Sequence, residues 1–299
     1  MKACLFVGDI SLDLSLSASH VPAPDEKVHC SAASEGVGGV VTNTAVAFAK
    51  AGGQAVLAVQ VGDDPASEAI GDQLDYAGLD FRPHRIAGGL CRVVTILEPH
   101  GEKRLLLYPG VSIFPGERVI EALNLAGLDH LHTACFGPAA HALVAHARAE
   151  GMTWSIDLEP ATFRNGIGEL VDVLAGAELV FVNDRAADAI GADALTQLLA
   201  LGVRAIIRSR GPLGAEYHSP GAAIAARPPE GLQIVDTTGA GDCLAGWFLA
   251  GRAAGLSLET ALGRAVNAAT FSCGHIGAQT GYPTPRDIQN FSIRTEEVA

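Results

Sequence analysis

Residues 236–242 read DTTGAGD and stand directly before an apolar segment with helical spacing, residues 244–254. The glycines let the backbone approach a ligand closely, and the segment after them places the loop at a helix N-terminus. Free N–H groups and the positive end of the helix dipole favour an anion there, above all a phosphoryl group. Asp242 would lie in the first turn, where a carboxylate can take the proton of a hydroxyl that attacks phosphorus. The stretch therefore predicts a phosphoryl-transfer site, and the alternative is a tight turn in which Asp242 merely caps the helix.

Outward from this loop, the chain alternates short apolar runs with alanine-rich helical segments. The runs that read as buried parallel strands are residues 3–7, 55–61, 153–156, 179–182 and 205–207. Helical spacing marks residues 44–51, 67–77, 139–150, 195–201 and 258–273. The alternation predicts an α/β fold: a doubly wound, mainly parallel sheet flanked by helices.

Two segments, about residues 14–35 and 88–110, do not fit this alternation. The first leaves no room for a crossover helix. Within the second, residues 90–108 alternate, turn at Pro99-His100-Gly101 and alternate again, which predicts a β-hairpin. We expect both segments to form a small sheet that projects from the body as a lid. Because no linker or internal repeat interrupts the chain, residues 1–299 are expected to form one domain.

Composition excludes several classes of protein. Of 299 residues, 48% are hydrophobic and 18% charged, the balance of an ordinary globular protein. Acidic residues outnumber basic ones by 33 to 20, and the net charge of −13 argues against nucleic acid as a partner. Six scattered cysteines without a C-x-x-C pattern predict reduced thiols and a cytoplasmic protein. No signal peptide and no membrane span are expected, so a membrane partner is excluded as well.

The DTTGAGD stretch resembles the D-T-x-G-A-G-D signature of the ribokinase-like (PfkB) carbohydrate kinase family, and similar motifs follow along the whole chain. GDISLD at 8–13 is similar to the opening strand of that family, and GGVVTN at 38–43 resembles its G-G-x-x-x-N segment. The resemblance implies that Asp13, Gly38, Gly39 and Asn43 hold the hydroxyls of a sugar. A hydroxyl-rich ligand needs acceptors and donors, and Asp13 with Asn43 supplies both. The alternatives are that Asp13 is a turn residue and that Asn43 caps the helix expected at 44–51.

Weaker similarities point to a nucleotide site. SRGPLG at 209–214 resembles the family's T-x-G-x-x-G nucleotide loop, with a serine in place of the threonine. The residues that the resemblance assigns to the nucleotide are Asn183, Ser209, Gly211, Gly214 and Asn267. Helix packing or loop geometry is the alternative for each of them.

The chain departs from the family pattern in two places. Val41 stands where the family has a small residue, and Ala186 replaces the Glu of the N-x-x-E segment that helps to order Mg²⁺. Magnesium needs oxygen ligands, so the metal ligands stay open between Asp184, Asp188 and the phosphates with their water. The ten histidines lack the spacing of a zinc site and predict no metal centre.

The resemblance implies an ATP-dependent sugar kinase that uses Mg²⁺ and a monovalent cation such as K⁺. Its acceptor would be a primary hydroxyl of a sugar or sugar acid, of the ribose, fructose or ketohexose type. Asp242 would be the general base, and the N–H groups of Gly239, Ala240 and Gly241 would stabilise the transferring phosphoryl group. The lid would exclude water and, as often in this family, form the contact of a homodimer.

Two other functions remain as alternatives. A nucleoside kinase of the same family needs an aromatic side chain to stack on the base, and the lid offers only Tyr108. A non-catalytic sugar-binding or regulatory protein would be expected to lose the base, whereas Asp242 is present. The lid cations Arg92, Lys103 and Arg104 are interpreted as solvated charges that protect a sheet edge, with contact to a phosphate or carboxylate as the alternative.

Overall fold

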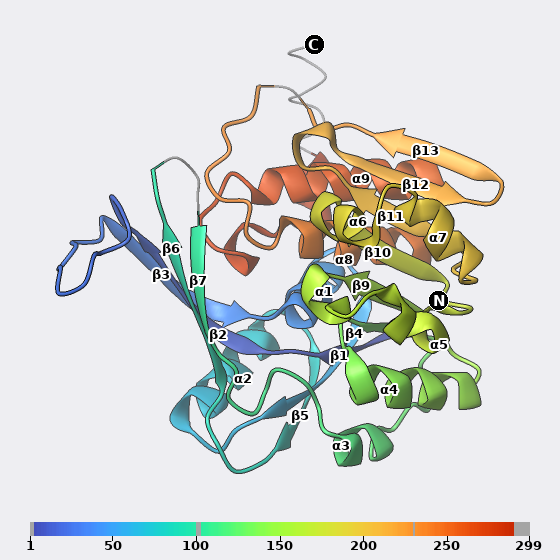
Figure 1. Cartoon of the computed structure of the whole chain (residues 1–299), viewed down its shortest axis with the longest axis horizontal. Helices are drawn as coiled ribbons and strands as arrows, with labels where there is room; N and C mark the ends of the chain where they lie inside the picture. Colours follow the sequence, from blue (N-terminus) through green and yellow to red (C-terminus); the bar gives the residue numbers. More distant parts are fainter. Residues whose placement is uncertain (1–2, 100–102, 230, 290–299) are drawn as a thin grey trace.

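A nine-stranded sheet forms the body of the protein (Figure 1). The computed structural model describes residues 3–99, 103–229 and 231–289. The strand order is β13-β12-β11-β10-β9-β8-β1-β4-β5; every pair from β5 to β11 is parallel, and β12 and β13 add an antiparallel hairpin at one edge. The bounds are β1 Ala3–Gly8, β4 Gln54–Val61, β5 Asp80–Arg85, β8 His130–Thr133, β9 Thr153–Leu158, β10 Leu179–Asn183, β11 Ile206–Ser209, β12 Ala215–Ser219 and β13 Ala222–Ala226.

Helices cover both faces of this sheet, and each face has its own hydrophobic core. Side chains alternate along β1, so Cys4 and Phe6 enter one core while Leu5 and Val7 enter the other. The first core is closed by α1 Val40–Lys50, α2 Pro65–Tyr76, α8 Ala240–Ala253 and α9 Leu258–Ser272. The second is closed by α3 Glu117–Glu121, α4 Gly137–Ala149, α5 Val171–Leu174, α6 Asp184–Ile190 and α7 Ala194–Ala200. Short 3₁₀ turns lie at η1 Pro160–Phe163, η2 Ile167–Leu170, η3 Gly211–Leu213 and η4 Gln279–Gly281.

A second, four-stranded sheet projects from the body and forms the lid (Figure 1). Its order is β3-β2-β6-β7, in which β2 and β6 are parallel and the other two pairs are antiparallel. The bounds are β2 Ser11–Ser17, β3 Ala32–Gly38, β6 Cys91–Leu97 and β7 Lys103–Tyr108. The hairpin predicted at residues 90–108 is confirmed as β6 and β7, and the first lid segment begins earlier than residue 14.

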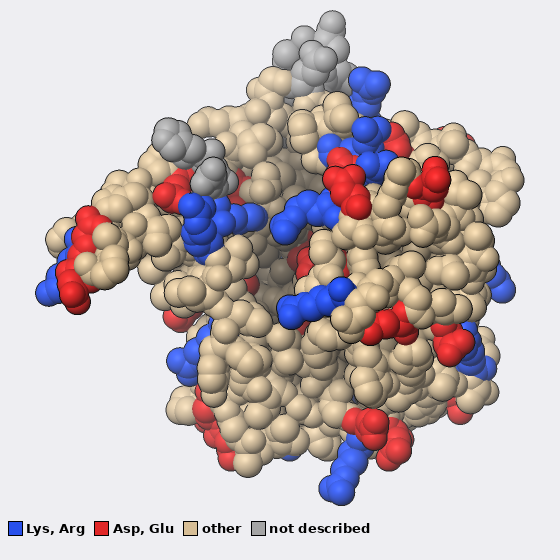
Figure 2. Space-filling view, viewed as in Figure 1, with Lys and Arg blue, Asp and Glu red and all other residues tan. Residues whose placement is uncertain are grey.

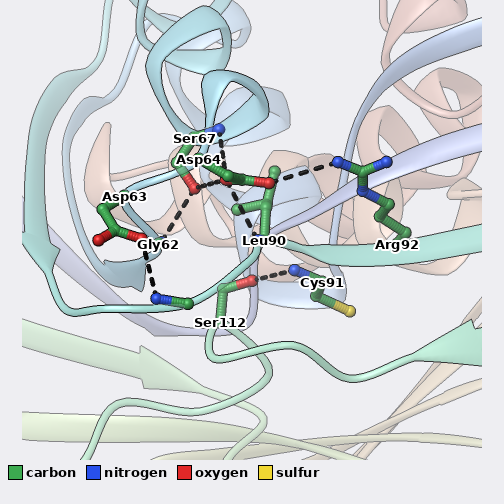
Figure 3. Close-up of polar contacts among 9 residues, drawn as sticks. Gly62, Asp63, Asp64, Ser67, Leu90, Cys91, Arg92 and Ser112 are labelled. Atoms are coloured by element: carbon green, nitrogen blue, oxygen red, sulfur yellow. Dashed lines mark hydrogen bonds and ion pairs between the residues drawn. The ribbon is translucent and has the colours of Figure 1, made fainter.

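One carboxylate joins the lid to the body at the start of β6 (Figure 3). Asp64 Oδ1 accepts hydrogen bonds from the backbone N–H and hydroxyl of Ser67, at 3.1 and 2.6 Å, and from the N–H of Leu90 at 3.3 Å. Asp64 Oδ2 lies 3.3 Å from Nη2 of Arg92 on β6. Beside it, Ser112 Oγ accepts from the N–H of Cys91 at 2.7 Å. These contacts fix the point at which the lid leaves the body.

The predicted fold class is confirmed, with differences at individual elements. The helix expected at 44–51 begins four residues earlier, at Val40. The sequence reading missed the β12–β13 hairpin, because β13 is the short run AAIAA at 222–226, made of small residues that give little periodic signal. In the described part of the chain, no helix has the length and apolar character needed to cross a membrane.

Candidate active site

The candidate site lies where the parallel strands end and the chain order of the sheet reverses. β1 pairs with β4 on one side and with β8 on the other, and ligands of such sheets bind in the crevice beyond the carboxyl ends at this point. Figure 2 shows a hollow between the lid and the body, with carboxylates on its floor and Lys and Arg side chains at its rim. Asp9 follows β1 and Glu159 follows β9, so both stand at this edge.

The glycine loop stands at the N-terminus of α8, the position that the sequence predicted for it. Gly239 is the N-cap of α8 in the left-handed conformation, with φ of 74°. A Cβ there would lie 2.5 Å from Tyr282 Oη and 2.6 Å from Ala278 Cβ, so only glycine fits. Tyr282 Oη donates to the carbonyl oxygen of Gly239 at 2.9 Å. One predicted donor is already engaged, because the Ala240 N–H lies 3.3 Å from the carbonyl oxygen of Thr237.

Asp236 holds the other end of this loop. Its Oδ1 accepts from the N–H and the hydroxyl of Thr238, at 2.9 and 2.7 Å, and its Oδ2 accepts from the Gly277 N–H at 3.0 Å. Burial alone raises the pKa of Asp236, but these hydrogen bonds together outweigh it and hold the pKa below the usual value. Asp236 is therefore a charged, buried support of the loop.

Asp242 lies in the first turn of α8 and is held by the amide of Asn43, which the amide of Gln279 holds in turn. Asn43 Nδ2 donates to Asp242 Oδ2 at 2.8 Å, and Gln279 Nε2 donates to Asn43 Oδ1 at 2.9 Å. Lys50 in turn fixes the segment that carries Gln279, because its Nζ donates to the backbone oxygens of Gln279 and Tyr282 at 3.0 and 3.3 Å. Three segments distant in sequence thus orient one carboxylate.

Asn43 is not the cap of α1, and that alternative is wrong. The N-cap is Gly39, and the N–H groups of Val40 and Val41 donate to the two carboxylate oxygens of Asp9 at 2.8 and 3.0 Å. Asn43 instead lies inside the helix, one turn further on, where its buried side chain faces Asp242. Sequence reasoning gave Asp9 no role, although its place directly after a buried strand was a usable signal.

The two glycines before α1 bring the backbone close to the carboxylates. Gly39 has φ of 106°, and a Cβ there would lie 2.6 Å from the Asp9 carbonyl oxygen. A Cβ at Gly38 would overlap the carboxylate of Asp13, so the predicted residues Asp13, Gly38 and Gly39 do lie together. Asp13 is a strand residue of β2, which excludes the turn alternative. Its Oδ1 accepts from Ser11 Oγ at 2.5 Å, while burial and the charge of Asp9 raise its pKa.

Further carboxylates surround the proposed base. Burial raises the pKa of Asp242 well above its usual value, and the charge of Asp157 raises it further, against the hydrogen bond from Asn43. Burial and the charges of Glu159 and Asp9 raise the pKa of Asp157 to about 8. Sequence reasoning missed Asp157 and Glu159. The one sequence feature that could have indicated them is their place directly after the predicted strand at 153–156, at its carboxyl end.

The residues predicted for the nucleotide are brought together only in part. Asn183 and Ser209 are register partners at the ends of β10 and β11. Asn183 also caps α6, because its Oδ1 accepts from the Ala186 N–H at 2.8 Å. Gly211 and Gly214 flank the η3 turn that follows Ser209, whereas Asn267 lies in α9, which packs against β12 and β13.

The two side chains considered for magnesium lie elsewhere. Asp184 Oδ1 is 2.7 Å from both Nε and Nη2 of Arg208 and 3.9 Å from Nε of Arg210, so arginine already neutralises it. Asp188 lines a cavity of about 340 Å³ beside α6 and α7. Over the described ranges, no three His, Cys, Asp or Glu side chains are grouped closely enough to hold a metal ion by themselves.

Known proteins share the family and the fold of this chain. The model of the pfkB family of carbohydrate kinases matches residues 1–285. The chain is 29% identical to the ATP-dependent ribose-1-phosphate kinase of Halopiger xanaduensis over 97% of its own length and 98% of the relative's. It is 30% identical to the cytidine kinase of Thermococcus kodakarensis over 74% of its length and 80% of the relative's. Its fold is similar to that of ribokinase from Thermotoga maritima, with a TM-score of 0.81, 21% identity, and coverage of 98% and 99% of the two chains. The chain belongs to the pfkB family of carbohydrate kinases, ATP-dependent phosphotransferases with an alcohol group as acceptor.

Proposed function

We propose that the protein transfers the γ-phosphoryl group of ATP to a primary hydroxyl of a sugar or sugar acid, with Asp242 as the general base. The observation that carries the proposal is the position of Asp242, in the first turn of α8 and directly after the glycine loop. Its raised pKa makes it a stronger base than an exposed aspartate, and its hydrogen bond with Asn43 fixes its orientation.

In the proposed step, the hydroxyl oxygen of the acceptor attacks the γ-phosphorus. A new O–P bond forms while the bond from the γ-phosphorus to the bridging oxygen breaks, and that electron pair leaves with ADP. The hydroxyl proton passes to a carboxylate oxygen of Asp242. The sequence assigned stabilisation of the transferring group to the N–H groups of Gly239, Ala240 and Gly241. Because the Ala240 N–H donates to Thr237, we assign it to the N–H groups of Gly239 and Gly241 and to the positive end of the α8 dipole.

The acceptor would lie between β2 of the lid and the start of α1. Asp13 supplies acceptor oxygens there, and the lack of side chains at Gly38 and Gly39 leaves the backbone open to the ligand. The Asn43 amide gives one hydrogen bond to Asp242 and accepts one from Gln279, which leaves capacity for a hydroxyl of the sugar. The nucleotide would extend past Asn183 and Ser209 toward the η3 turn with Gly211 and Gly214, and Asn267 of α9 is proposed for the same ligand.

Asp157 and Glu159 would hold the Mg²⁺ that accompanies ATP. Both side chains stand at the end of β9, where neither makes a hydrogen bond or an ion pair with the described residues, and their charges help to raise the pKa of Asp242. Two carboxylates together with phosphate oxygens and water are the ligand set that this ion prefers. The ion supplies charge neutralisation of the phosphates. Asp157 and Glu159 would take over the role of the family's Glu, which Ala186 replaces in this chain. A requirement for a monovalent cation such as K⁺ remains a prediction from the family resemblance.

A nucleoside acceptor is the alternative, supported by the likeness to a cytidine kinase. The one aromatic side chain of the lid strands, Tyr108, is 58% exposed and therefore available to a ligand. It stands opposite Arg92, however, at the end of β7 that is tied to the body through Asp64, whereas Lys103 at the other end of β7 lies 3.4 Å from Thr238 of the glycine loop. A sugar acceptor is therefore favoured. A non-catalytic role would leave the oriented, high-pKa carboxylate of Asp242 without a purpose.

We also infer that the enzyme is a homodimer joined through the lid. β7 is an edge strand with free backbone groups on one side, and its apolar side chains are more than half exposed: Leu105, Leu106, Leu107 and Tyr108. Such an edge favours pairing with another strand, and a second copy offers one with the same pattern.

The remaining inferences are that residues 1–299 act as one kinase domain and that the six free cysteines belong to a cytoplasmic protein.

The proposed function is tested by ADP release from ATP and Mg²⁺ with a panel of alcohols. The panel holds ribose, ribose 1-phosphate, fructose, ketohexonates and nucleosides, and each product is identified by mass. We expect a sugar or sugar acid to give the highest kcat/KM. A nucleoside as the preferred substrate would support the alternative, and no transfer to any alcohol would refute the proposal.

A further inference from the structure

One side-chain amide of the η4 turn reaches α1 beside the proposed base. Gln279 Nε2 donates to Asn43 Oδ1 at 2.9 Å, although 236 positions of sequence separate the two residues. The backbone around Gln279 is fixed as well, because Lys50 Nζ donates to its carbonyl oxygen at 3.0 Å and to that of Tyr282 at 3.3 Å. Asn43 and Lys50 both belong to α1 and stand about two turns apart on the same side of the helix. The helix therefore holds the η4 segment at two points.

The contact with Gln279 decides which way the amide of Asn43 points. An amide presents an acceptor oxygen on one side and N–H donors on the other. Oδ1 of Asn43 accepts from Gln279, while Nδ2 donates to Asp242 Oδ2 at 2.8 Å. A half turn of this amide would place its oxygen against a carboxylate oxygen and would set the N–H groups of Asn43 and Gln279 against each other. Asn43 is only 5% exposed, so water has little access to replace the lost hydrogen bonds.

The reaction itself changes the demand on this amide. When Asp242 takes the proton of the acceptor, it becomes a carboxylic acid that can donate as well as accept. The attraction that draws Asn43 Nδ2 toward Asp242 then weakens, and a turned amide could accept from the new O–H. Gln279 keeps its N–H donors whether or not Asp242 is protonated. Its hydrogen bond therefore holds the amide of Asn43 in one orientation throughout the step.

A fixed donor at Oδ2 gives the two oxygens of Asp242 different roles. Oδ2 is engaged by Asn43, whereas Oδ1 makes no hydrogen bond with the described residues. Asp242 is partly exposed, so a hydroxyl in the site can approach this second oxygen. A carboxylate free to rotate would carry Oδ1 away from the hydroxyl, and a displacement of about 1 Å can cost about 100-fold in rate.

We propose that Gln279 is a positioning residue for the general base: through the amide of Asn43 it holds Asp242 with Oδ2 engaged and Oδ1 turned toward the acceptor hydroxyl. The proposal rests on the proposed kinase function and deepens it, because it assigns the proton of the acceptor to one oxygen of Asp242. Gln279 gives up no proton itself and acts on the reaction through Asn43 alone.

A purely structural role for Gln279 makes different predictions. The η4 segment also supports the glycine loop, because Tyr282 Oη donates to the carbonyl oxygen of Gly239. If Gln279 only kept this segment in shape, its loss would lower the melting temperature and raise the KM for ATP. Its effect on kcat would also multiply with that of Asn43→Ala. A residue that acts through the Asn43 amide has no further effect once that amide is gone.

The experiment is a double-mutant cycle on the full chain, with Gln279→Met, Asn43→Ala and the double variant. Methionine has nearly the length of glutamine and lacks the donor, and it leaves the backbone contacts with Lys50 available. We expect Gln279→Met to lower kcat by about 10–100-fold, with little change in the KM for ATP or in the melting temperature. In the Asn43→Ala background, the same substitution should change kcat by less than about twofold.

Two further variants test the donor and the segment separately. Gln279→Glu keeps the shape of the side chain without its N–H donors, so its kcat should fall as well. Thr280→Val is the matched control, because this hydroxyl of the same segment donates to the backbone oxygens of Ile276 and Gly277 instead of Asn43. Its kcat should stay within about twofold of wild type.

Losses that multiply in the double variant, or a kcat of Gln279→Met within about threefold of wild type, would overturn the positioning role. An equal loss of kcat in Thr280→Val would also overturn it, because the effect would then belong to the segment as a whole. Failure of the proposed function gives a different result, because the wild-type protein itself would then transfer no phosphoryl group to any alcohol of the panel.

Discussion

Replacing Asp242 by Asn should abolish most activity and at the same time stabilise the protein at alkaline pH. Asn has nearly the size of Asp and keeps an oxygen that can accept a hydrogen bond from Asn43 Nδ2. In the wild-type protein this nitrogen lies 2.8 Å from Oδ2 of Asp242. The orientation of α8 and of the loop before it should therefore persist. Asn cannot take the proton of the attacking hydroxyl, so kcat should fall by about 10²–10⁴-fold, with the KM for ATP nearly unchanged.

The gain in stability follows from the direction of the pKa shift. Burial, and then the charge of Asp157, raise the pKa of Asp242 above its unfolded value of 3.8. The folded protein then binds more protons than the unfolded chain, so the contribution of this group to stability falls as the pH rises from 3.8 through the folded pKa. Each pKa unit corresponds to about 1.4 kcal/mol. In a chain of this size, about 1 kcal/mol shifts the melting temperature by a few degrees.

Both effects are measured on the same preparations. Steady-state ADP release gives kcat, and thermal melts at pH 5 and pH 8 give the stability difference, which should be larger at pH 8. Asp188→Asn is the matched control, since this exposed aspartate of α6 lies outside the proposed site. Phosphoryl transfer within a few-fold of wild type would remove Asp242 from the mechanism. A melting-temperature difference that does not grow with pH would refute the electrostatic reasoning.

Three further outcomes are expected. Asn43→Ala removes a hydrogen bond that lowers the pKa of Asp242, so the acidic limb of the kcat profile should move to higher pH; an unmoved limb would contradict this orienting role. Leu106→Glu places a charge on the exposed edge of the lid and should shift sedimentation equilibrium from dimer to monomer, whereas a wild-type monomer would end the dimer proposal. Burial lowers the pKa of His130 and of His132 to about 3, below the unfolded value of 6.5, so each should lower folding stability by about 1.4 kcal/mol per pH unit as the pH drops below 6.5. His132→Gln should remove one of these two contributions in acid titrations monitored by denaturant unfolding, and the exposed His141→Gln should leave both intact.

The sequence predicted correctly those features whose conformation depends on residues close together in the chain. The loop at 236–242 needs only its own glycines and the helix after it, and the structure places it at the N-terminus of α8 as predicted. The hairpin at 90–108 is likewise set by alternation around a turn and is confirmed. Both features depend on residues that are neighbours in sequence.

The missed features depend on contacts between distant residues. α1 begins at Val40 because the carboxylate that binds its first N–H groups comes from Asp9, 31 residues earlier, so no cap is visible at the helix itself. Glu159 acquires its role only because β9 ends beside the other carboxylates. Lys103 was interpreted as a solvated charge of a sheet edge, since nothing in its own segment indicates that Thr238 lies next to it.

The contacts of Asp64 with Leu90 and Arg92 anchor one end of the β6–β7 hairpin, here called the hinge, and the hairpin forms an arm that reaches the loop before α8. Tyr108 at the hinge and Lys103 at the far end of β7 are five positions apart, and at a rise of about 3.4 Å per residue this arm is about 17 Å long. A rotation of roughly 10° at the hinge therefore sweeps the free edge through about 3 Å, the length of a hydrogen bond. Substitutions around Asp64 that touch no ligand are therefore expected to change the turnover rate.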